Sequence, residues 1–196
     1  MLPSGIVGPL RKLATLLLAG VAFGILVAVV KGQDTGVRDA LGNTSAPWIV
    51  LPFLAGTRFA RGSRAALAGF AVTLASFLGF YVAEAAVLDL GPHPWWDDLR
   101  LTAGYVNVYE KWGIFSGLAY GTLGWLWAYR SKAVAAVSVG CAFVAEPAIV
   151  LFLSRAGIWP GLLLDYDWMW ITEIVLGLAA IAVALTARPP HRTRAA

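Results

Sequence analysis

The chain has 196 residues, of which 59% are hydrophobic and 13% are charged. Soluble domains carry about 25% charged residues, so this composition excludes an ordinary water-soluble domain and indicates that lipid is the solvent. The net charge of +4 would suggest nucleic acid only if the basic residues formed a patch or stripe. They fall instead in short clusters between apolar runs, so no nucleic-acid partner is expected. The single cysteine, Cys141, excludes an internal disulfide and is expected to be a packing residue.

Six apolar runs follow one another along the chain. They cover residues 12–30, 46–60, 65–88, 110–129, 133–154 and 168–187. Since a helix needs about 20 residues to cross a bilayer, we expect an all-α integral membrane protein with about six transmembrane helices. These helices are expected to form one bundle over residues 1–187, followed by a basic cytoplasmic tail at 188–196. The run at 46–60 is short and contains Pro47 and Pro52, which makes it the least regular of the six.

Basic residues cluster at alternate ends of these runs. The clusters are Arg11/Lys12, Arg58/Arg61/Arg64, Arg130/Lys132 and Arg188/Arg192/Arg194. The positive-inside rule places these ends, and with them both chain termini, in the cytoplasm of a multi-pass protein of the cell membrane. The acidic residues then fall in the outer loops and in the outer halves of the helices. We therefore expect the chemistry of the protein on its outer side.

Three glutamates lie inside apolar runs, where an ionisable group costs about 2.5–3.5 kcal/mol or more and is functional by default. Glu146 is followed by Pro147, Glu84 occurs in a similar Val-Ala-Glu stretch, and Glu173 lies in the last run. At about 1.5 Å per residue, Glu84 and Glu173 are roughly 6 Å, and Glu146 about 12 Å, from the outer helix ends. Because burial disfavours a charge, we expect one or more of them to be protonated at neutral pH. The alternative is a structural hydrogen bond from each to a neighbouring helix.

Aromatic side chains gather on the same predicted side of the membrane. Those expected to line a substrate pocket with the three glutamates are Tyr81, Trp95, Trp96, Tyr109, Trp112, Trp168 and Trp170. An aromatic belt would occupy both interfaces, so an excess on one side indicates a binding site. No metal or cofactor is expected, because the acidic pairs are short and two histidines are too few for a zinc site.

Glycines recur every fourth residue in the fourth run, at Gly113, Gly117 and Gly121. Such spacing makes a flat helix face that another backbone can approach closely. We expect this face to pack within the bundle. The alternative is a homo-oligomer that forms through it.

Buried acids beside aromatic rings suit the protonation of a polyene, because a neutral carboxyl in a dry pocket donates a proton and aromatic faces stabilise a carbocation. In its size, its helix number and the placement of Glu84, Glu146 and Glu173 beside Trp and Tyr, the chain resembles the small integral-membrane terpene cyclases of actinobacteria. The resemblance implies a metal-independent cyclisation of an isoprenoid or prenylated substrate taken from the bilayer. Glu146 or Glu84 would be the acid.

Two other interpretations stay open. Six spans, cytoplasmic termini and Trp-containing outer loops also resemble the substrate-binding subunit of an energy-coupling-factor vitamin transporter. Small residues on the first helix of that subunit contact the transport module, and Ala19, Gly20 and Gly24 match this feature. Acidic and aromatic residues would there suit a cationic vitamin or amine. The third interpretation is a structural membrane protein whose glutamates hold helices together.

Overall fold

A computed structural model describes residues 4–31, 36–88, 94–105, 107–157 and 166–186. All regular elements in these ranges are α-helices. They are α1 (Ser4–Lys31), α2 (Gly36–Asn43), α3 (Ser45–Gly56), α4 (Gly62–Leu88), α5 (Trp95–Tyr105), α6 (Asn107–Tyr129), α7 (Lys132–Arg155) and α8 (Asp167–Thr186). The expected all-helical fold is confirmed for this part of the chain, whereas the tail at 188–196 lies outside it.

Among the described helices, four are long and apolar enough to cross a membrane. Their apolar stretches are Arg11–Lys31, Gly62–Ala86, Lys132–Arg155 and Asp167–Thr186, in α1, α4, α7 and α8. α6 covers the run at 110–129, and its 23 residues make it roughly 34 Å long. The run at 46–60 differs, because α3 ends in a turn after Gly56 and has only 12 residues. At roughly 18 Å, against a hydrocarbon core of about 30 Å, α3 is too short to cross by itself.

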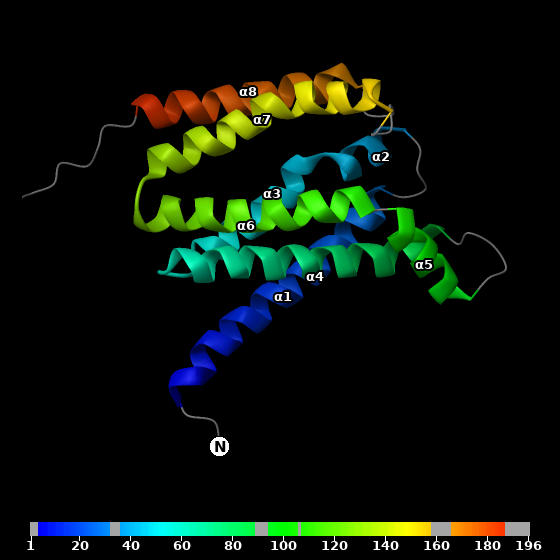
Figure 1. Cartoon of the computed structure of the whole chain (residues 1–196), viewed down its shortest axis with the longest axis horizontal. Helices are drawn as coiled ribbons and strands as arrows, with labels where there is room; N and C mark the ends of the chain where they lie inside the picture. Colours follow the sequence, from blue (N-terminus) through cyan, green and yellow to red (C-terminus); the bar gives the residue numbers. More distant parts are fainter. Residues whose placement is uncertain (1–3, 32–35, 89–93, 106, 158–165, 187–196) are drawn as a thin grey trace, which may run out of the picture.

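One end of the bundle carries the described basic clusters from which the topology is predicted. The first turns of α1, the α3–α4 turn, the α6–α7 turn and the last turns of α8 lie together at the left of Figure 1. These segments include Arg11/Lys12, residues 58–64 and residues 130–132, and we call this the basic end. α2 and α5 lie at the opposite end. The clustering agrees with the charge pattern used to predict the topology, while the cytoplasmic assignment itself stays a prediction.

Glycines set the packing of α1, α3 and α6 around α4. A Cβ on Gly24 of α1 would overlap the backbone carbonyl of Ser76 on α4, and one on Gly69 of α4 would overlap that of Gly117 on α6. A Cβ on Gly56 of α3 would overlap the carbonyl of Gly121 on α6. Since lipid offers no hydrophobic driving force between helices, such close backbone approach supplies the packing that holds them together.

The predicted glycine face of α6 is therefore used inside the chain. Gly117 and Gly121 are buried against α4, and Gly113 faces the ring of Phe77, also on α4. Two of the three small residues of α1 that matched the transporter subunit, Gly20 and Gly24, likewise pack against α4, whereas Ala19 is exposed.

α7 and α8 form a hairpin that packs chiefly on itself and touches the rest of the bundle through α6. Gly140 and Gly177 bring the two backbones together, each meeting the carbonyl of the other. At the end opposite the basic turns, a cluster of buried residues joins the hairpin to α2; its members are Ala40, Val150, Met169 and Trp170. The hairpin is thus joined to the other helices near its two ends. Cys141, expected to be a packing residue, is exposed on α7, because that side of the helix faces away from both α6 and α8.

Candidate functional site

The three glutamates fall into two separate groups. Glu84 of α4 faces α1, where its Oε1 accepts a hydrogen bond from the Lys31 ammonium at 2.5 Å. Both side chains are buried, at 10% exposure for Lys31 and 7% for Glu84. The ammonium also lies 5.8 Å from the ring centre of Phe80. Glu84 therefore belongs to an ion pair that joins the ends of α1 and α4, and this pair has a structural role.

Aromatic rings surround this ion pair. Trp48 contacts Phe77 and Phe80 at centroid distances of 5.3 and 5.4 Å, and Tyr81 stacks on Phe77 at 6.1 Å. Tyr81 is thus brought near Glu84, as the sequence indicated, but it lies in a packed core cluster with Phe80.

Glu146 and Glu173 form the second group, on α7 and α8. The charge of Glu146 acts on Glu173 and also on Tyr120 of α6, so the three side chains lie close together where these helices meet. Glu173 is only 5% exposed. Neither of its carboxyl oxygens has a hydrogen-bond partner among the described residues. A buried acid without a partner costs stability, and such groups in membrane helices are functional by default.

Between α3, α6, α7 and α8 lies a pocket of about 440 Å³, within the range of about 300–1,000 Å³ usual for small-molecule sites. Its lining residues are Ile49, Val50, Phe53, Leu54, Tyr120, Trp127, Ala136, Val139, Phe143, Ala179, Ala180 and Val183. The wall is apolar except for the Tyr120 hydroxyl and the Trp127 indole nitrogen. The pocket exists because α3 packs on α6 while the α7–α8 hairpin diverges from them between its two attachment points.

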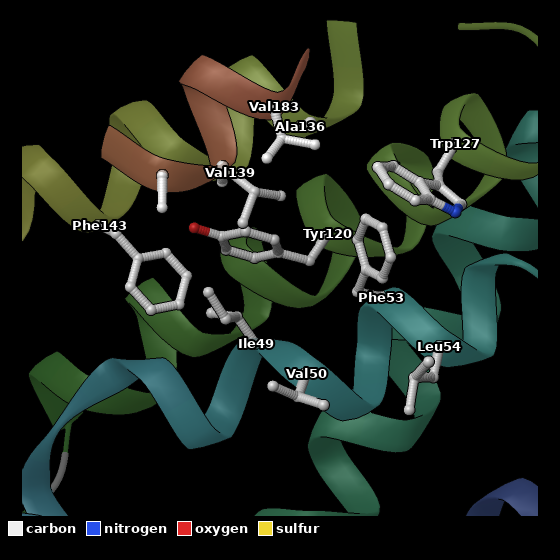
Figure 2. A pocket seen from close by; sticks show the side chains of 12 residues that line it. Ile49, Val50, Phe53, Leu54, Tyr120, Trp127, Ala136, Val139, Phe143 and Val183 are labelled. Carbon is white, nitrogen blue, oxygen red and sulfur yellow. The ribbon is translucent and has the colours of Figure 1, made fainter. Parts of the chain in front are cut away.

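Tyr120 stands in the middle of this pocket. In Figure 2 its ring lies between Val139 and Ile49, and its oxygen points toward Phe143 and away from Phe53. Glu146 follows Phe143 by one helical turn, or about 4.5 Å along α7, and Glu173 precedes Ala179 by about 9 Å along α8. The acid pair therefore lies just beyond the end of the pocket that the Tyr120 hydroxyl faces.

The opposite end of the pocket lies at the basic end of the bundle. Trp127 is near the end of α6, and its ring packs edge-on against Phe53 at 6.2 Å. The Lys132 ammonium lies 5.9 Å from the centre of the Trp127 ring. On the side, Val50, Leu54 and Val183 are at least half exposed, so the pocket opens on the lateral surface of the helices. In a bilayer, an apolar molecule would enter from there.

The structure distributes the other predicted site residues over several places. Trp95 and Trp96 are exposed at the start of α5, and Trp168 is exposed at the start of α8. Trp170 is buried with Met169 in the cluster that joins the hairpin to α2. Tyr109 and Trp112 belong to α6, but their side chains lie outside the described residues. None of the predicted aromatic residues whose side chains are described lines this pocket, and a site on the outer side stays a prediction.

Sequence reasoning missed Tyr120, Phe53, Trp127 and Phe143 as pocket residues. They gave no signal, because an aromatic residue in an apolar run is equally suited to lipid contact, packing or a pocket. Lys31 was also missed as the partner of Glu84. A signal existed there, since both residues lie near the ends of apolar runs on the same predicted side of the membrane and carry opposite charges.

Residues 4–196 match a family described as a family of unknown function (DUF6518), and the chain belongs to that family. No curated protein and no solved structure matches the chain.

Proposed function

We propose that this member of DUF6518 is a multi-pass protein of the cell membrane that cyclises an isoprenoid substrate by protonating it. The substrate lies in the pocket between α3, α6, α7 and α8, and the Glu146–Glu173 pair supplies the proton. The observation that carries the proposal is the pair formed by buried Glu173 and half-buried Glu146 near Tyr120, at one end of an aromatic-lined pocket. The proposal keeps the chemistry expected from the sequence. It assigns that chemistry to a pocket nearer the basic end of the bundle than the outer-side pocket that the sequence predicted.

The reaction is an isomerisation. The carboxyl O–H bond of the acid pair breaks and its proton adds to a terminal double bond of the substrate, whose π electrons form the new C–H bond. In an epoxide substrate the proton adds to the ring oxygen, and one C–O bond breaks to leave a hydroxyl group and a carbocation. The resulting carbocation is attacked by the π electrons of the next double bond, which forms a carbon–carbon bond and closes a ring. Loss of a proton to the acid pair ends the sequence. No atom is gained or lost overall, so the product has the mass of the substrate.

Each residue of the site has a role in this reaction. Glu173, buried and without a hydrogen-bond partner among the described residues, is held neutral by its environment and donates the proton, because a charged carboxyl would be poorly solvated there. Glu146 lies beside it and takes back a proton at the end. Tyr120 directs its hydroxyl to the end of the pocket at which the acids lie. The rings of Phe53 and Phe143 offer their faces to the developing cation.

The proposal is tested with the full-length protein in lipid nanodiscs, supplied with linear farnesyl and geranylgeranyl compounds, with and without an aromatic group. We expect a new product of unchanged mass by chromatography with mass detection. Glu146→Gln and Glu173→Gln should each lower its rate by about 10²–10⁴-fold, the usual contribution of a positioned acid or base. Asp167→Asn, at an exposed carboxyl in the first turn of α8, is the matched control and should keep the rate. Full conversion by the double variant Glu146→Gln/Glu173→Gln would refute the proposal.

A further inference from the structure

The end of the pocket at the basic end of the bundle carries positive charge without an ion-pair partner among the described residues. Arg130 and Lys132 flank the α6–α7 turn and are both exposed. Neither makes an ion pair with a carboxylate of the described residues; the pairs found there are Lys31–Glu84 and Arg100–Asp97. The two cations instead lie over indole rings, Arg130 at 5.5 Å from Trp125 and Lys132 at 5.9 Å from Trp127.

Trp127 connects this charge to the pocket, because the same ring lines the pocket and lies beneath the Lys132 ammonium. A second basic turn lies next to it. The Trp125 indole donates a hydrogen bond to the carbonyl of Ala60 at 2.9 Å, which fixes residues 58–64 beside the α6–α7 turn. The arrangement along the pocket toward the basic end of the bundle is therefore two acids, an apolar and aromatic channel, and then two exposed cations.

We infer that the ligand of this pocket is a single-chain amphiphile whose apolar tail fills the pocket and whose phosphate head group is bound by Arg130 and Lys132. Charge complementarity carries the inference, since two cations without a carboxylate partner among the described residues, at one end of an apolar cavity, match an anion on an apolar chain. It rests on the pocket of the proposed function and names the substrate class. It does not depend on the reaction.

The inference also gives the substrate a direction. With the head group at Lys132, the tail runs toward Tyr120, which lies seven residues and about 10 Å from Trp127 along α6. The far end of the tail then meets the Glu146–Glu173 pair. Protonation begins at that end, and the bond between carbon and phosphate oxygen is not broken.

Equilibrium binding distinguishes this inference from a cluster that only sets membrane topology. The probes are farnesyl phosphate and farnesol, which share one tail, and the full-length protein is held in nanodiscs of zwitterionic lipid. We expect the phosphate to bind more tightly than the alcohol. Lys132→Gln and Arg130→Gln should each weaken binding of the phosphate about fivefold, the effect of one cation near a membrane surface, and leave the alcohol unchanged. Lys12→Gln, in the exposed basic cluster of α1, is the matched control and should change neither.

Each result decides something different. If the two probes bind equally, or if Lys12→Gln weakens the phosphate as much as Lys132→Gln does, the head-group site is refuted while the pocket stands. If Ala136→Phe, which fills the pocket, fails to weaken both probes, the pocket itself is refuted, and the proposed function with it. Lysophosphatidic acid is the third probe. Equal binding of this straight-chain phosphate supports the amphiphile site but contradicts an isoprenoid substrate.

Discussion

Replacing Glu173 by methionine is expected to make the protein more stable and inactive. Glu173 is 5% exposed, and neither of its oxygens has a hydrogen-bond partner among the described residues. A buried polar group without partners costs about 1–3 kcal/mol. Methionine has a similar shape and a high helix propensity, so Glu173→Met should recover about 1–3 kcal/mol. For a chain of this size, that corresponds to a rise in Tm of between about 2 and 12 °C.

The matched control is the same substitution at Glu84, which has the opposite environment. Glu84→Met leaves the Lys31 ammonium buried without its carboxylate, and removing one partner of a buried pair costs about 3–5 kcal/mol. The Tm should therefore fall by between about 6 and 20 °C. Thermal unfolding in detergent micelles, followed by tryptophan fluorescence, measures both variants under one condition.

The test is whether the two variants change the Tm in opposite directions, upward for Glu173→Met and downward for Glu84→Met. A stabilised but inactive Glu173→Met would show that the acid is retained for function at a cost in stability. A loss of stability comparable to that of Glu84→Met would refute the reasoning, since Glu173 would then be a satisfied structural group. That result would favour the interpretation of the protein as a structural membrane protein.

Three further predictions concern the packing that holds the site. The double variant Lys31→Met/Glu84→Met should unfold within about 1 kcal/mol of the wild type, because replacing both members of a buried pair is often neutral; strictly additive losses from the single variants would contradict this. Gly69→Ala should lower the free energy of unfolding by about 1–3 kcal/mol, since its Cβ would overlap a backbone carbonyl of α6. The control Ala119→Leu, on the exposed side of α6, should change it by less than about 0.5 kcal/mol. Thermal unfolding separates the two. Trp125→Phe removes the indole hydrogen bond that joins the end of α6 to the α3–α4 turn. It should lower the free energy of unfolding by about 0.5–1.5 kcal/mol and increase proteolytic cleavage in the α3–α4 and α6–α7 turns. Unchanged cleavage would show that this hydrogen bond does not hold the two turns together.

The sequence determined most of the helices. Five of the six apolar runs became long helices, and apart from the start of α1, which lies eight residues before the run at 12–30, their ends fall within about three residues of the expected ones. Lipid leaves the backbone no partner except itself, so an apolar run of about 20 residues has no alternative to a helix. The remaining run, at 46–60, did not form a long helix, because α3 ends in a turn after Gly56. The sequence also singled out Glu84, Glu146 and Glu173, since an acid in an apolar run is rare enough to be noticed at once.

Only the tertiary structure decided which of these groups meet. It paired Glu84 with Lys31, brought Glu146 to Glu173 and Tyr120, and formed the pocket toward the basic end of the bundle. A helix in water shows its packing side as a stripe of apolar residues. A helix in lipid is apolar on every side, so its sequence does not reveal which side packs. That choice was made by the close approach of backbones at glycines such as Gly69 and Gly140, a property of pairs of helices that no single run contains.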